Sequence, residues 1–130
     1  MGQPAAKQGD RIQALDTHIV IVPGASPIPL PHPFSGTISG GLSGDVNIMG
    51  KPAATVDSTA DNGPAHIPTS PGTAFQAPPA NKGTIKLGSS TVRINGKMAA
   101  RHGDVATTCN DPVDLPIGTV VAAAGSVFIG

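Results

Sequence analysis

The stretch Met98-Ala99-Ala100-Arg101-His102-Gly103-Asp104 has two counterparts in the same chain. One is Pro4-Ala5-Ala6-Lys7-Gln8-Gly9-Asp10, and the other is Pro52-Ala53-Ala54-Thr55-Val56-Asp57. Each copy carries an Ala-Ala pair followed by an aspartate, and the aspartates at 10, 57 and 104 are 47 residues apart each time. A shared motif at constant spacing is the signature of an internal repeat. We therefore expect these three aspartates to occupy equivalent positions.

A short segment that alternates apolar and polar residues precedes the second and third motifs. It reads Asp45-Val46-Asn47-Ile48-Met49-Gly50-Lys51 before the second motif and Thr91-Val92-Arg93-Ile94-Asn95-Gly96-Lys97 before the third. Alternation with a period of two predicts a half-buried strand, and the Gly-Lys that follows fits a tight hairpin turn. The chain ends on a third such segment, Gly125-Ser126-Val127-Phe128-Ile129-Gly130, so the N-terminus holds the half-repeat that the C-terminus lacks.

The repeats and the composition together predict a mainly β fold. Each repeat reads as a strand, a tight turn, a short strand and a long variable loop. Three such units predict a pseudo-threefold β assembly in which the two termini complete one repeat. Of the 130 residues, 17 are Gly and 14 are Pro, and the chain has no Glu. Because helices tolerate Gly and Pro poorly, a helical bundle is excluded and no significant helix is expected.

The apolar content predicts one small domain, residues 1–130, with a thin core. The chain has three Phe, no Trp or Tyr, and one cysteine, Cys109, which excludes an internal disulfide. Thin-cored small domains commonly need a metal, a disulfide or a partner for stability. A metal or a partner is therefore expected here.

The charged and apolar residues indicate the compartment in which the protein is made and the class of partner that it lacks. Eight basic and eight acidic residues balance to zero net charge, which gives no footprint for nucleic acid. The first residues lack the apolar core of a signal peptide, and the uncharged residues 115–130 are too short and Gly-rich to cross a bilayer. We expect synthesis and assembly in the cytoplasm.

Each repeat carries one imidazole or thiol after its aspartate. His18 lies 8 residues after Asp10, His66 lies 9 after Asp57, and Cys109 lies 5 after Asp104. Equivalent positions of a threefold arrangement meet at its axis, so these side chains are expected to converge there. His32, in the first long loop, is the natural fourth ligand. Three His and one Cys form a closed tetrahedral shell, which suits a structural Zn²⁺ better than an octahedral, oxygen-preferring ion.

Other interpretations of these residues give an enzyme. With only three ligands bound, the zinc would keep an open position, and Asp16 or Asp111 could serve as a base in a small zinc hydrolase. Cys109 beside a His could instead act as a nucleophile. No hydrolase or phosphate-loop motif supports either, so no catalytic and no cofactor-binding residue is predicted. His102, before its aspartate, is expected in solvent or at an interface.

The repeated Pro-Ala-Ala-Lys/Arg and Gly-Asp, the strand-Asn-Gly-Lys segment and the terminal Gly-Ser-Val-Phe-Ile-Gly resemble the PAAR-repeat family. The resemblance spans Pro4 to Gly130. It implies a small cone of short strands with a metal near its tip, held by three His and one Cys. By motif position, His18, His66 and Cys109 would be ligands. The middle copy departs from the pattern, with Thr55 in place of Arg or Lys and no Gly before Asp57.

The resemblance also implies a function. PAAR-repeat proteins are non-catalytic tips that cap the homotrimeric spike of contractile injection systems, either type VI secretion or extracellular phage-tail-like particles. Sheath contraction would drive the tip transiently against a target membrane and deliver it outside the cell or into a target cell. The bound metal would be zinc, with iron as the less favoured alternative. No toxin extension is expected on this chain.

The first repeat carries an insert loop at about residues 19–44, as in the proteins of extracellular particles. An alternative role is an effector-loading adaptor at the spike tip. The apolar residues Ile28, Leu30 and Phe34 of the insert would then contact the cargo.

Overall fold

Strands make up all the regular structure of the described chain. The computed structural model describes residues 2–122 and 125–130, and no helix occurs among them. Within this part of the chain there is therefore no helix long and apolar enough to span a membrane. The strands are β1 (Gln3–Pro4), β2 (Arg11–Ile21), β3 (Ile28–Gly40), β4 (Asn47–Ile48), β5 (Lys51–Pro52), β6 (Thr59–Asn62), β7 (Ala74–Phe75), β8 (Lys82–Ile85), β9 (Arg93–Ile94), β10 (Lys97–Met98), β11 (Val105–Thr108), β12 (Leu115–Val121) and β13 (Phe128–Ile129).

Six antiparallel strands close into a small barrel. Their order is β2-β3-β6-β8-β11-β12, and β12 pairs back with β2 to complete the ring. The barrel therefore consists of three strand pairs, one from each repeat, and the mainly β prediction is confirmed. Closure leaves few unpaired strand edges within the barrel. Its interior holds a small cluster of fully buried side chains, which includes Ile12, Phe34, Ile38, Ile85 and Val120.

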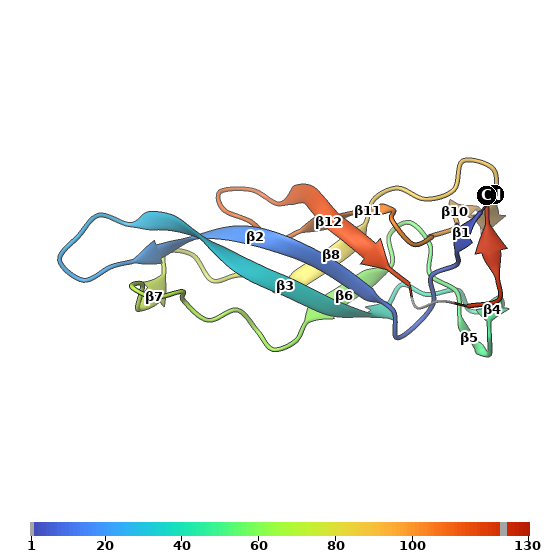
Figure 1. Ribbon diagram of the computed structural model, residues 1–130, viewed down its shortest axis with the longest axis horizontal. Helices are drawn as coiled ribbons and strands as arrows, with labels where there is room; N and C mark the ends of the chain where they lie inside the picture. Colours follow the sequence, from blue (N-terminus) through green and yellow to red (C-terminus); the bar gives the residue numbers. More distant parts are fainter. Residues whose placement is uncertain (1, 123–124) are drawn as a thin grey trace.

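Three two-stranded sheets form the opposite end of the molecule from the β2–β3 tip (Figure 1). Two are local, β4–β5 and β9–β10, and their turns Met49-Gly50 and Asn95-Gly96 have positive φ at both positions. Positive φ at both central residues is the requirement of a type I′ turn. The third pairs β1 with β13, with Gln3 opposite Ile129, so the two termini do complete one repeat. We call this end the base.

Backbone hydrogen bonds between the repeats follow a threefold pattern. The amide of Ala6 donates to Ala100 O (3.0 Å), Ala100 N donates to Ala54 O (3.1 Å), and Ala54 N donates to Ala6 O (3.0 Å). Each repeat thus donates to one neighbour and accepts from the other, which closes a ring of three bonds. All three alanines are fully buried, and a larger side chain would separate the strands. This alanine ring connects the base to the barrel.

The expectation that all three aspartates occupy equivalent positions is wrong for Asp57, whose place is taken by Ser58, the next residue. The turn after the ring is closed by a side chain that accepts from the backbone three residues earlier: Asp10 from Lys7 N (3.0 Å), Asp104 from Arg101 N (2.7 Å), but Ser58 from Thr55 N (3.0 Å). Asp57 instead occupies the place of the turn glycines, with φ of 77°. The true spacings are therefore 48 and 46 residues, and the serine hydroxyl replaces the carboxylate.

The expected insert loop at about 19–44 is also wrong in part, because most of it is a long hairpin. β2 and β3 pair over ten residues, from Arg11–Thr37 to Val20–Ile28. Pro29, Pro31 and Pro33 alternate along β3 at the level where β6 does not reach it, so their missing N–H groups face an unpaired edge. Phe34 of this hairpin is buried in the barrel, which removes it from any cargo surface.

The long hairpin gives the molecule a tapered shape. Figure 1 shows the barrel narrowing from the base, where both termini lie, to the β2–β3 turn with β7 beside it. β7 pairs with the end of β2, Val20 opposite Phe75. The molecule is thus wide at the base, where three two-stranded sheets lie together, and narrow at the end formed by the β2–β3 turn and β7.

The register assignment gives a prediction for residue 57. An L-residue in the left-handed region is strained by roughly 1–2 kcal/mol, less for Asp than for Ala, whereas Gly is not. We expect Asp57→Gly to be about 1 kcal/mol more stable than Asp57→Ala in urea unfolding. The exposed Asp57–Lys97 pair (3.5 Å) is lost in both variants and cancels.

The matched control is Asp61, an exposed residue inside strand β6. There Gly costs about 0.5–1 kcal/mol relative to Ala, so the order of the two variants should reverse. The same order at both positions would contradict the assignment of Asp57 to the glycine position.

Candidate metal centre

Four potential metal ligands from three parts of the chain meet inside the barrel. They are Asp16, His18, His66 and Cys109, and one donor atom from each lies within 4.8 Å of all the others. Asp16, His18 and Cys109 are buried, and the side chain of His66 is nearly so. A buried group of two imidazoles, a thiol and a carboxylate is the donor set of a zinc-type site.

Different elements bring these four residues together. Asp16 and His18 are two apart on β2 and therefore face the same side of the strand, toward the barrel axis. Cys109 directly follows β11, and His66 lies in the segment between β6 and β7. In the corrected register His18 and His66 both stand 8 residues after the residue that closes their turn, Asp10 and Ser58. Equivalent positions in two repeats thus supply the two imidazoles.

Asp16 is the hub of the cluster. Its Oδ2 accepts from His66 Nε2 (3.0 Å) and from the thiol of Cys109 (3.4 Å), and its Oδ1 accepts from Thr108 Oγ1 (2.5 Å). The Cys109 sulfur also lies 3.6 Å from His18 Nε2. A fully buried carboxylate is costly unless it is hydrogen-bonded or paired, and here it has three polar neighbours.

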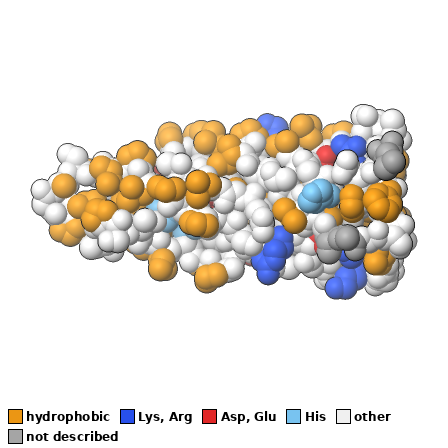
Figure 2. Space-filling model, in the orientation of Figure 1, with side chains coloured by type: hydrophobic (Ala, Val, Ile, Leu, Met, Phe, Trp, Pro, Cys, Tyr) orange, Lys and Arg blue, Asp and Glu red, His pale blue; other side chains and the backbone are white. Residues whose placement is uncertain are grey.

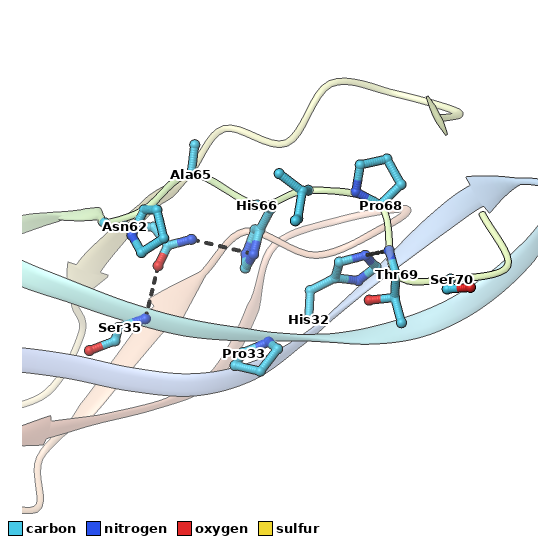
Figure 3. A pocket seen from close by; sticks show the side chains of 12 residues that line it. His32, Pro33, Ser35, Asn62, Ala65, His66, Pro68, Thr69 and Ser70 are labelled. Atoms are coloured by element: carbon cyan, nitrogen blue, oxygen red, sulfur yellow. Dashed lines mark hydrogen bonds between the residues drawn. The ribbon is translucent and has the colours of Figure 1, made fainter. Parts of the chain in front are cut away.

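His32 packs its ring against the cluster but uses both of its nitrogens elsewhere. The His32 ring centroid lies 5.5 Å from that of His18 and 5.6 Å from that of His66. Its Nδ1 donates to Leu30 O (2.9 Å), and its Nε2 accepts from Thr69 N (3.1 Å), as Figure 3 shows. Burial, together with the neighbouring imidazoles, lowers the pKa of His32, so the ring is neutral at pH 7. To ligate a metal, Nε2 would have to give up the bond from Thr69.

An open pocket gives solvent access to one side of the cluster. His32 and His66 lie on its inner wall, and Pro33, Ala65 and Pro68 form much of the rest (Figure 3). Asn62 bridges this wall, because its amide donates to His66 Nδ1 (3.3 Å) and its carbonyl oxygen accepts from Ser35 N (2.9 Å). The pocket therefore provides an entry path that ends at an imidazole.

Burial controls the chemistry of Cys109. Desolvation raises the pKa of its thiol to about 11, and the nearby Asp16 carboxylate adds to the rise. A thiol with this pKa is protonated at pH 7, which disfavours the interpretation of Cys109 as a nucleophile. Metal binding would have to displace this proton, because the thiolate is the ligand.

Three of the four predicted ligands thus meet, and one residue was missed as a donor. His18, His66 and Cys109 lie in the cluster, His32 lies against it, and Asp16 takes the fourth place. The signal for Asp16 was its position two residues before His18 on an alternating strand. His102 lies at the base, exposed, with its Nδ1 accepting from Ala122 N (3.2 Å).

The chemistry of the donor set fits a metal. Among the described residues, His18 Nδ1 is the one buried side-chain nitrogen or oxygen without a hydrogen-bond partner. This nitrogen lies 3.5 Å from Asp111 Oδ2, outside normal hydrogen-bond distance, and the other ring nitrogen, Nε2, faces the Cys109 sulfur at 3.6 Å within the cluster. Two imidazoles, a thiolate and a carboxylate can complete a tetrahedral shell without a solvent position.

Comparison with known proteins identifies one family. A family model described as PAAR motif matches residues 31–114, which is well over half of the chain. A search among curated proteins gave no match.

The cluster predicts a dependence of stability on Cys109 and zinc. With zinc at about a thousand times its dissociation constant, binding adds about 4 kcal/mol to folding, or a rise in Tm on the order of 10–20 °C. Thermal unfolding with zinc and with a chelator should show this rise for the wild type and lose it in Cys109→Ala and His66→Ala. His102→Ala, at the base, is the control and should keep it. An equal rise in all four proteins would remove the structural metal.

The raised pKa of Cys109 predicts a proton release. Binding of one zinc at pH 7.5 should release about one proton from the thiol, so the zinc affinity should rise by about tenfold per pH unit around this pH. Calorimetry in two buffers of different ionisation enthalpy measures the number. The Cys109→Ala variant should release about one proton fewer, and the same number in both proteins would show that the thiol does not bind zinc.

Proposed function

Because the chain belongs to the PAAR motif family, we propose that it is the non-catalytic, metal-stabilised tip that caps the trimeric spike of a contractile injection system. The system is either an extracellular phage-tail-like particle or a type VI secretion apparatus. In this role the base docks on the homotrimeric spike protein, and the narrow end leads toward the target membrane. The chain would be assembled in the cytoplasm and leave it as part of the particle.

The observation that carries the proposal is the threefold base. A single chain can cap a symmetric trimer only if it offers similar surfaces to three subunits. The three two-stranded sheets of the base, held together by the buried alanine ring, supply three such surfaces at intervals of one repeat. The exposed valines of the base are equivalent as well: Val46, Val92 and Val127 each accept from the first alanine of a pair at 3.0 Å and are 37%, 36% and 38% exposed.

The distribution of charge supports a tip that enters a bilayer. Residues 17–34 form the outer part of the long hairpin, residues 63–81 follow β6 and include β7, and neither segment contains Lys, Arg, Asp or Glu. On the face drawn in Figure 2 the Lys and Arg side chains lie over the base and the middle, and the narrow end carries hydrophobic and uncharged groups. Charged groups are the most expensive to move into lipid, so this end is the less costly one to insert.

Zn²⁺ is the metal that we propose, held by Cys109, His18, His66 and one further donor. Asp16 is favoured as that donor, and His32, the ligand expected from sequence, would serve only after releasing Thr69. The metal would join β2, the β6–β7 segment and the end of β11 into one rigid unit. Iron is an alternative because a thiolate with imidazoles suits both ions, but it is less favoured because a closed tetrahedral shell is typical of zinc.

A second role, loading of an effector, has one observation in its favour. Leu15 on β2 and Ile117 on the neighbouring β12 are exposed on the barrel wall, with Val113 close by in sequence. A cargo protein could cover these side chains without blocking the base. This adaptor role is compatible with capping.

Mixing the protein with its spike trimer tests the capping role. We expect one chain per trimer by mass measurement of the complex. A triple change of Val46, Val92 and Val127 to Asp should weaken capping by at least a hundredfold, because it places three carboxylates in an apolar interface. Ile67→Asp, an exposed apolar residue outside the base, is the control and should cap normally. Capping that survives the triple change would locate the interface elsewhere.

A further inference from the structure

Asp111 lies against the unpaired nitrogen of a proposed ligand. Its Oδ2 is 3.5 Å from His18 Nδ1, the buried nitrogen described above as lacking a partner. The His18 side chain is 1% exposed and the Asp111 side chain is 15% exposed, so water screens the interaction between them only weakly. The other nitrogen of the ring, Nε2, faces the Cys109 sulfur at 3.6 Å. The two nitrogens of His18 thus face different neighbours: a carboxylate on one side and the donor cluster on the other.

Backbone contacts with β2 hold Asp111 in this place. Its amide donates to Thr17 O (2.8 Å), and its Oδ2 accepts from Ile19 N (2.9 Å). Thr17 and Ile19 are the residues on either side of His18. Asn110 adds a third contact, because its Oδ1 accepts from Thr17 N (2.6 Å). The carboxylate is therefore fixed relative to the strand segment that carries the imidazole.

This geometry specifies one tautomer of the imidazole. A neutral imidazole carries one proton, and the nitrogen without the proton is the one that can bind a metal. A carboxylate beside Nδ1 favours the proton there and leaves the lone pair on Nε2, toward Asp16 and Cys109. Carboxylates that hold a ligating histidine in this way also raise its basicity as a ligand.

We propose that Asp111 is a positioning residue of the metal centre, which orients His18 and fixes its proton on Nδ1 so that Nε2 is free for the metal. The inference rests on the metal centre proposed above. In this role Asp111 does not act as a catalytic base, and the metal needs no open coordination position.

The test compares Asp111→Asn with Asp114→Asn in the full chain. Asn keeps an oxygen for the Ile19 amide but removes the charge beside Nδ1, whereas Asp114 is exposed and serves as the matched control. Zinc affinity is measured by competition with a chelator, and the Tm of the metal-free proteins is measured alongside. Removal of such a partner typically weakens metal binding by about 10–100-fold. We expect this loss in Asp111→Asn, no loss in Asp114→Asn, and metal-free Tm values that agree.

Nitrogen NMR of the zinc-loaded proteins reports the tautomer directly. In the wild type the proton of His18 should be on Nδ1 and protected from exchange, and in Asp111→Asn this protection should be lost. Equal zinc affinity of Asp111→Asn and wild type would overturn the proposal. So would a loss of affinity accompanied by an equal fall in the metal-free Tm, because Asp111 would then only strap the loop. A wild type that binds no zinc would instead refute the metal centre itself.

Discussion

The ring of hydrogen bonds among Ala6, Ala54 and Ala100 is the constraint on which the rest of the structure depends. Three chain segments can exchange main-chain bonds around one axis only if no side chain larger than a methyl group intervenes. The Ala-Ala pairs meet this condition in all three repeats. The base lies on one side of the ring, and the barrel with the candidate metal centre lies on the other.

The sequence predicts the local structure around this ring because the signals there are short-range. Alternating residues before Gly-Lys give the base hairpins, and the missing half-repeat at the C-terminus gives the pairing of β1 with β13. The one-residue error at Asp57 has a physical origin. An aspartate in a glycine's conformation looks like the motif's acid, and only the partner of the Thr55 amide reveals that Ser58 performs that part.

The long hairpin and the fourth donor were harder to predict, because they depend on contacts across the fold. The prolines of β3 indicate a loop until β6 is seen to stop short of them. Asp16 is unremarkable in sequence, since a lone Asp on a strand is usually exposed. Its importance follows from the barrel, which brings Thr108, His66 and Cys109 to the same carboxylate. Repeat equivalence did indicate His18 and His66, which stand 8 residues after the residues that close their turns.

The pairing of β1 with β13 has a consequence for biosynthesis. A chain emerges from the ribosome with its N-terminal side first, and domains made of local contacts begin to fold while synthesis continues. Here Gln3 cannot pair until Ile129, which lies 126 residues further along the chain, has been made. The third face of the base therefore cannot exist on a nascent chain. In the proposed capping role, a spike that needs all three faces would therefore accept only chains synthesised through Ile129.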